Sequence, residues 1–275
     1  MVSNKKNTRS EFHADWQIFM QYLTQEFSDY FEFPTLGAIA GINAKGGENW
    51  ECPSSTIIFK KIDLGQKAMP KSAYRGEGKV KLIVKGQGIA YESNTICNPL
   101  ETMSVQIIIE VARRKKGAEK VLKASWHMDK QSDLKKAQTA NSLNNNNLSE
   151  YQRSIIASEQ ENDDEFHHSE YHLHFGGKEL TEDANINGNI LLLGSPRIQY
   201  YPMDIILAID FVIKNFYAID KRKKLEKTKY TKVVERAKER LWKPYIYAMA
   251  STFDAQLFSH FSIDSTFINN ILGKF

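Results

Sequence analysis

The segment from His167 to Phe175 reads His-His-Ser-Glu-Tyr-His-Leu-His-Phe, and these residue types can bind a metal ion or carry a proton. In an extended strand, successive side chains point to opposite faces. A strand here places one apolar face on Tyr171, Leu173 and Phe175. The opposite face carries His168, Glu170, His172 and His174. The alternation therefore predicts either a site or the polar side of a half-buried strand.

A divalent metal is one cofactor that this polar face could hold, because imidazole and carboxylate groups are ligands of Zn²⁺ and of other transition metals. His172 and His174 are two residues apart, so both can approach one ion, and Glu170 can add a ligand. A catalytic version of the site adds Asp210 from a later helix, with Arg197 binding an anionic group. The alternatives are a hydrogen-bonded strand face and a pH-sensitive or partner-binding role. The identity of the metal stays open.

Asp210 also has a purely structural interpretation. It lies between Ile209 and Phe211 in an apolar segment, where a carboxylate needs a partner or a raised pKa. Lys214 follows four residues later, which is one helical turn, and it can pair with Asp210. The sequence leaves both interpretations open.

A basic region near the C-terminus is the second candidate site. Residues 214–243 hold twelve Lys or Arg and four Asp or Glu, a local excess of +8. The residues expected to contact phosphates are Lys221, Arg222, Lys223, Lys224, Lys232, Arg236, Arg240 and Lys243. Such a stripe predicts salt-sensitive binding that is independent of base sequence. A solvated helix face, or shielding by the acidic residues 150–170, is the alternative.

Familiar catalytic motifs are absent from the chain. Gly46-Gly47 and Gly86-Gln87-Gly88 match neither a Walker A loop nor a dinucleotide fingerprint. No Gly-x-Ser-x-Gly elbow occurs, and the only two cysteines predict no disulfide framework. Whether the protein is an enzyme is left undecided.

The elements that must position these residues follow from periodicity. Apolar residues recur every three or four positions over residues 10–31, which predicts an amphipathic helix closed by Pro34. Alternating patterns predict strands at residues 55–62, 79–85, 89–92, 103–113, 120–127, 171–175 and 189–193. Helices are predicted at residues 203–217, 230–252 and 254–272, with Pro244 kinking or dividing the second.

This order predicts one α+β domain over residues 1–275, in which a mostly antiparallel sheet packs against an N-terminal helix and a C-terminal helical region. Residues 10–128 form the helix and most of the sheet, and residues 166–275 complete the strands and add the C-terminal helices. The polar residues 129–165 form a surface insertion with a short helix near 148–157.

Composition narrows the class of protein. The apolar fraction of 41% and the charged fraction of 25% are ordinary for a soluble domain. No apolar run reaches the roughly 20 residues of a membrane span, and the N-terminus lacks the apolar core of a signal peptide. A cytoplasmic protein without membrane contact is expected.

Three segments within residues 165–218 form a connected pattern: Tyr171-His-Leu-His-Phe-Gly-Gly177, Ser195-Pro-Arg-Ile198, and the run from Pro202 to Phe216. This pattern is similar to that of a family of uncharacterised bacterial proteins that occur with mobile elements and defence genes. The resemblance implies one signature that includes His172, His174, Gly176, Gly177, Arg197, Asp204 and Asp210. It implies no particular activity.

Three hypotheses follow. The first is a non-catalytic component of an antiviral-defence or mobile-element system, which contacts nucleic acid or a protein of the same gene cluster through residues 221–243. The second is a metal-dependent hydrolase or nuclease centred on His172, His174 and Asp210. The third is a structural protein with neither role.

Overall fold

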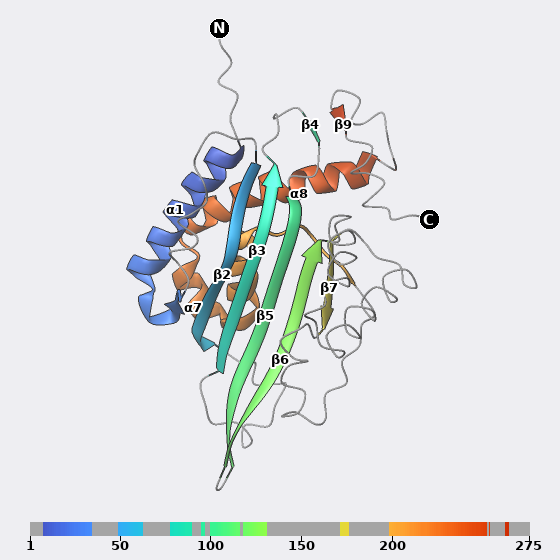
Figure 1. The fold of residues 1–275 in the computed structure, drawn as a ribbon. Coiled ribbons are helices and arrows are strands. Elements are labelled where there is room, and N and C mark those ends of the chain that lie inside the picture. The colour runs from blue at the N-terminus through green and yellow to red at the C-terminus, as the bar shows by residue number, and fades with distance from the viewer. Residues whose placement is uncertain are drawn as a thin grey trace, which may run out of the picture.

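The computed structural model describes residues 8–34, 49–62, 78–89, 95–96, 100–115, 118–130, 171–175, 198–251, 253 and 262–263. Figure 1 shows a tall, twisted sheet with the helices gathered on one side of it. The strands are β1 (Phe31–Glu32), β2 (Asn49–Ile62), β3 (Gly78–Ile89), β5 (Leu100–Lys115), β6 (Ala118–Lys130), β7 (Tyr171–Phe175) and β8 (Ile198–Gln199). They lie in that order across the sheet, and every neighbouring pair is antiparallel. The predicted α+β class and sheet type are confirmed.

The N-terminal helix α1 spans Thr8–Glu26 and buries its apolar stripe. Phe12, Phe19 and Leu23 are each at most 2% exposed. The prediction that this helix continues to residue 31 was wrong. A 3-10 turn over Ser28–Tyr30 follows the helix. Phe31 then belongs to β1 and pairs with Phe59 of β2, so it is part of the sheet and not of the helix.

The core lies between the sheet and helix α6 (Ile205–Phe216). Leu82 in β3 and Ile107 in β5 are fully buried, and so is Ile209 in α6. The helix is apolar nearly all round, as expected, but it begins after Asp204 and not at residue 203.

Strand β3 is longer than predicted, because it runs through Gly86 and Gly88 to Ile89 without a break. A Cβ atom on Gly86 would lie 3.2 Å from the carbonyl oxygen of Thr102. The glycine therefore allows β3 and β5 to approach closely, and it does not mark a turn.

The hairpin of β5 and β6 was predicted correctly, although both strands are longer than the pattern suggested. Asp129 and Lys130 belong to β6 and pair with His172 and Tyr171. The predicted surface insertion therefore does not include them. Residues 131–170, with the helix predicted near 148–157, lie outside the described residues, as does the strand predicted at 189–193.

Two more helices complete the C-terminal region. Helix α7 spans Ile219–Leu225 and was not predicted as a separate element, whereas α8 spans Thr228–Ser251, close to the predicted bounds. Pro244 lies inside α8 and does not divide it.

A small second sheet corrects the expected last helix. Strand β9 (Ser262–Ile263) pairs in parallel with β4 (Thr95–Ile96), so the helix predicted for residues 254–272 is interrupted there by extended backbone. The remaining residues of that predicted helix are outside the part of the chain that the structure describes. Among the helices that are described, none is both long and apolar enough to cross a membrane.

Candidate functional site

The histidine strand is β7, and its register places it beside polar residues of β6. His172 lies opposite Asp129, and His174 lies opposite His127. His172 Nε2 is 2.6 Å from Asp129 Oδ1, and the two residues are 2% and 8% exposed. A carboxylate this deeply buried needs a partner, and His172 is that partner. The pair therefore has a structural role, because it joins β6 and β7. His172 therefore does not lie on an open, solvated strand face.

The polar contacts continue onto β5. His127 Nε2 lies 3.1 Å from Ser104 Oγ and 3.7 Å from Asp129 Oδ2. In a Ser-His-Asp triad, the serine and the carboxylate hold opposite nitrogens of the imidazole ring. Here both approach Nε2. The geometry is therefore a polar row across three strands and not an activated nucleophile.

This row lies on the sheet face opposite the one that the described helices cover. Met128, between His127 and Asp129, is fully buried in the core, and the ring of Trp126 lies 6.3 Å from Phe216 of α6. Side chains alternate along β6, so His127 and Asp129 belong to the opposite face. The sequence held a signal for them, because His127 and Asp129 have the same two-residue spacing as His172 and His174.

Within the described residues, no group of three His, Cys, Asp or Glu side chains is arranged to hold a metal ion. Glu170 and Arg197, as well as the side chain of His174, fall outside what the structure describes. The predicted metal site over His172, His174 and Glu170 stays a prediction.

Asp210 has the structural partner that its spacing suggested. Lys214 Nζ donates to Asp210 Oδ2 at 2.7 Å, and the hydroxyl of Tyr230 in α8 donates to Oδ1 at the same distance. Burial and the adjacent Asp210 carboxylate raise the pKa of Tyr230 well above its ordinary value. One carboxylate oxygen thus pairs within α6, and the other links α6 to α8.

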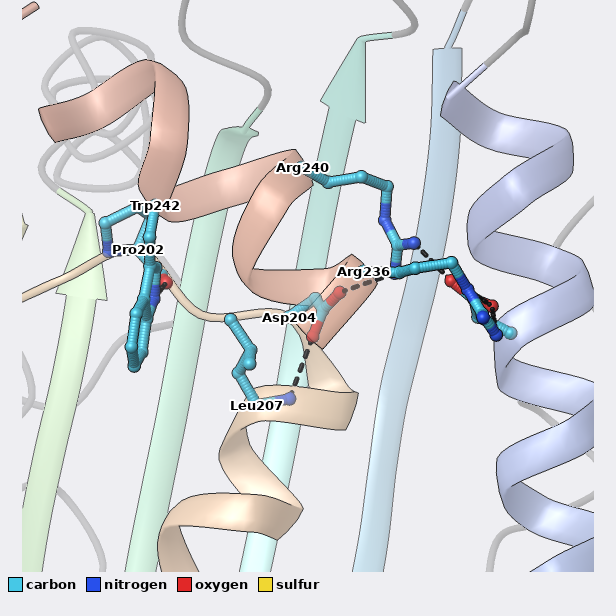
Figure 2. A network of polar contacts seen from close by, with 7 residues as sticks. Pro202, Asp204, Leu207, Arg236, Arg240 and Trp242 are labelled. Atoms are coloured by element: carbon cyan, nitrogen blue, oxygen red, sulfur yellow. Dashed lines mark hydrogen bonds and ion pairs between the residues drawn. The ribbon is translucent and has the colours of Figure 1, made fainter. Parts of the chain in front are cut away.

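The arginines of α8 also act inside the fold (Figure 2). Arg236 Nε donates to Asp15 Oδ1 of α1 at 2.7 Å, and Arg240 Nη1 pairs with Asp15 Oδ2. Arg240 is only 8% exposed. It therefore does not lie on the exposed helix face where the sequence placed it for phosphate contact. The reason is Asp15, a partner 225 residues away along the chain.

Asp204 joins the same network at the start of α6. Its Oδ1 accepts from the backbone N–H of Leu207 at 2.9 Å, and its Oδ2 lies 3.6 Å from Arg240 Nη2. Burial raises the pKa of Asp204, and Arg240 together with the helix N–H groups opposes that rise. The indole N–H of Trp242 donates to the carbonyl of Pro202 at 2.9 Å, which fixes the segment before α6.

The lysines on α7 and on the first turns of α8 are different. Those that are exposed and form no ion pair with any described residue are Lys223, Lys224, Lys229 and Lys232, here called the lysine surface. The other predicted cations contact the protein. Lys221 Nζ donates to the carbonyl of Lys61, Arg222 contacts the carbonyl of Lys214, and Lys243 lies over the ring of Tyr247.

A groove runs between α1 and α8 beside this lysine surface. One wall consists of Lys229, Lys232 and Arg236 from α8. The α1 side contributes Ile18, Gln21, Tyr22, Gln25 and Glu26. The hydroxyl of Tyr22 donates to the carbonyl of Leu225 at 2.9 Å, which ties the groove to the end of α7. Two lysines and Arg236 on the α8 side thus face amide and apolar groups on the α1 side of the groove.

Comparisons of the chain with family models, with curated proteins and with solved structures found no match. The resemblance over residues 165–218 stays a prediction.

Proposed function

We propose that the protein binds nucleic acid without catalysing a reaction on it, through the lysine surface and the groove between α1 and α8. The observation that carries this proposal is the wall formed by Lys229, Lys232 and Arg236. The resemblance to proteins found with defence genes and mobile elements adds the expectation that such binding serves a system of that kind.

The lysine surface supports binding to a polyanion because its four lysines are exposed and form no ion pair within the part of the chain that the structure describes. Each cation that neutralises a phosphate releases a condensed counterion, so affinity falls as salt rises. Arg236 is 44% exposed although it pairs with Asp15, so it can present donors to a ligand while holding α1. Arg240 is excluded from the binding surface because its charge is buried.

The groove adds contacts that are not purely electrostatic. Gln21 and Gln25 supply amide donors and acceptors, and Ile18 is 42% exposed. A nucleotide placed against the α8 cations would meet these groups on its other side. Glu26 lines the α1 side of the groove and repels phosphate. A phosphate group should therefore approach along the α8 wall.

The test compares two variants of equal charge by fluorescence anisotropy with labelled DNA and RNA between about 50 and 200 mM salt. Lys229→Gln with Lys232→Gln removes two groove cations. Lys79→Gln with Lys85→Gln removes two exposed cations from β3. The groove variant is expected to lower the salt slope by about 2, since each phosphate contact contributes about 0.9 for duplex DNA. The β3 variant is expected to bind as the wild type does.

Equal binding by all three proteins would overturn the proposal. An equal loss in both variants would also overturn it, because the effect would then follow net charge and not the groove. Binding of an acidic protein in place of nucleic acid would make the groove a protein interface.

A second candidate function is metal-dependent hydrolysis at the histidine strand. The register favours it, because His127 and Asp129 lie directly opposite His174 and His172. The expected result is one equivalent of metal in the purified protein, lost in His172→Ala and in His174→Ala. Metal-free protein with an unchanged melting temperature after zinc addition would contradict this function.

A further inference from the structure

The β5–β6 hairpin extends beyond the rest of the sheet. The last β3 residue paired with β5 at this end is Lys79, opposite Glu110. Five further residue pairs join β5 to β6 beyond this point, from Val111↔Leu122 to Lys115↔Ala118. Among the described strands, β6 is the only partner of β5 there. Figure 1 shows this two-stranded arm projecting past β2 and β3. At about 3.3 Å per residue the paired part is roughly 17 Å long.

The arm is the second concentration of positive charge in the chain. Residues 110–123 hold six Lys or Arg against Glu110 and Glu119, a net charge of +4 that equals the net charge of all 275 residues. Two of the arm's five residue pairs, Val111↔Leu122 and Ala112↔Val121, are apolar, and each of the other three carries at least one charge. The composition of the arm therefore points to a charged partner.

The register sorts these charges onto two unlike faces. On one face, Glu110 lies opposite Lys123 and Glu119 lies opposite Arg114. The Glu110–Lys123 pair has its charged atoms 3.6 Å apart. Both glutamates of the arm are thus at positions opposite a cation, so this face is balanced by its own residues.

The other face has no acidic position. Val111 lies opposite Leu122, Arg113 opposite Lys120, and Lys115 opposite Ala118. Like charges directly opposite each other destabilise a pair of strands. This arrangement is unfavourable for the isolated arm, and an anion bound along that face removes the repulsion.

The cationic face is on the same side of the sheet as the helices. Arg113 alternates in step with Val105, Ile107 and Ile109, which are buried in the core. Helix α6 ends above Trp126, and α7 begins three residues later, at Ile219.

We propose that the β5–β6 arm enters the major groove of duplex DNA with its Arg113–Lys120 face toward the DNA. This inference depends on the proposed nucleic-acid function and assigns its substrate class. A B-DNA major groove, about 12 Å wide, admits a two-stranded ribbon, whereas the major groove of A-form RNA is too narrow and deep. Arg and Lys donors suit both phosphate oxygens and the O6 and N7 acceptors of guanine.

The test uses the full chain and a pair of variants with the same loss of charge. Arg113→Gln with Lys120→Gln neutralises the cationic face, and Arg114→Gln with Lys123→Gln takes two charges from the balanced face. The first variant is expected to lower affinity for a 20-base-pair DNA duplex about tenfold or more, and to reduce its salt slope by about 2. The second is expected to change affinity less than threefold.

Folding is checked by the melting temperature of each variant. The Arg113→Gln, Lys120→Gln protein should melt at the same temperature as the wild type or higher, because a like-charge pair is removed. Its affinity for an RNA duplex should equal that of the wild type. Equal losses in the two variants, or an equal loss for RNA, would overturn the arm as a DNA-docking element.

The groove variant separates this inference from the proposed function. If the Lys229→Gln, Lys232→Gln protein loses affinity and the arm variant does not, nucleic-acid binding stands and the arm assignment fails. If neither variant loses affinity for any nucleic acid, both fail.

Discussion

The arginines and the lysines of the C-terminal helices look alike in sequence but differ in what they contact. Arg236 and Arg240 both pair with Asp15, and the second is almost completely buried. Lys232 and Lys229, one and two turns before Arg236 on the same helix, are exposed. The planar guanidinium group suits a buried carboxylate, whereas the lysine ammonium group is strongly hydrated. Helical spacing alone therefore does not separate cations that pair inside the fold from cations that stay exposed.

The largest effect is expected from Asp15→Ala, which leaves Arg240 buried without its nearest partner. Removing one member of a buried ion pair destabilises a protein by about 3–5 kcal/mol. Urea unfolding measures the loss, and Gln17→Ala, on an exposed position of the same helix, is the matched control. A loss of unfolding free energy below about 1 kcal/mol would mean that the arginine pairs with Asp15 contribute as little to stability as the exposed lysines do.

Tyr230→Phe is expected to have the next largest effect. It removes a buried hydroxyl that donates to Asp210 and leaves that carboxylate oxygen without this donor. Such a loss costs about 1–3 kcal/mol in unfolding free energy. Tyr201→Phe is the control, because Tyr201 is 44% exposed and should change stability little. Equal effects of the two substitutions would show that Asp210 does not hold α8.

Asp204→Asn tests the network through pH. Burial raises the pKa of Asp204, so the folded protein binds this proton more tightly than the unfolded chain does. Its contribution to stability is fully present below the unfolded pKa, near pH 4, and is lost as pH rises through the higher folded pKa. The stability of the wild type relative to the variant should therefore decrease over that range.

The substitution itself should change stability little at low pH, because Asn also caps a helix well. Chemical denaturation of both proteins from pH 3.5 to 7 measures the change with pH. A relative stability that grows with pH would mean that the attraction of Arg240 outweighs burial.

The smallest effect on stability is expected from the lysine surface. Replacing Lys223, Lys224, Lys229 and Lys232 by Gln should change the free energy of unfolding by no more than about 0.5 kcal/mol per residue. The same protein should lose most of its salt-dependent binding to nucleic acid. A large stability loss together with unchanged binding would reverse the roles assigned to the two groups of cations.

Much of the fold could be predicted because it depends on local periodicity. The alternation in Val105–Val111 predicted a strand with a buried face, and the apolar segment after Pro202 predicted a buried helix. The end of α1 could not be predicted in this way. Phe31 fits the apolar stripe of the helix, but pairing with Phe59 gives it a buried position in β1.

The candidate site was harder to predict, because its contacts connect distant parts of the chain. The spacing to Lys214 indicated the Asp210 pair as one of two open interpretations, since both residues are on one helix turn. Nothing local indicates that Asp15 pairs with Arg240, or that Asp129 pairs with His172. These pairs depend on how α1 packs on α8 and on the register of β6 with β7.

The packing of α1 against α8 also sets an order of events during synthesis. The first helix leaves the ribosome early, but its partners Leu225, Tyr230 and Arg240 are made more than 200 residues later. At about 5–20 residues per second this delay is roughly 10–40 seconds. During that time the apolar stripe of α1 has no α8 to cover it. The nascent chain should therefore be a better substrate for chaperones than its finished form.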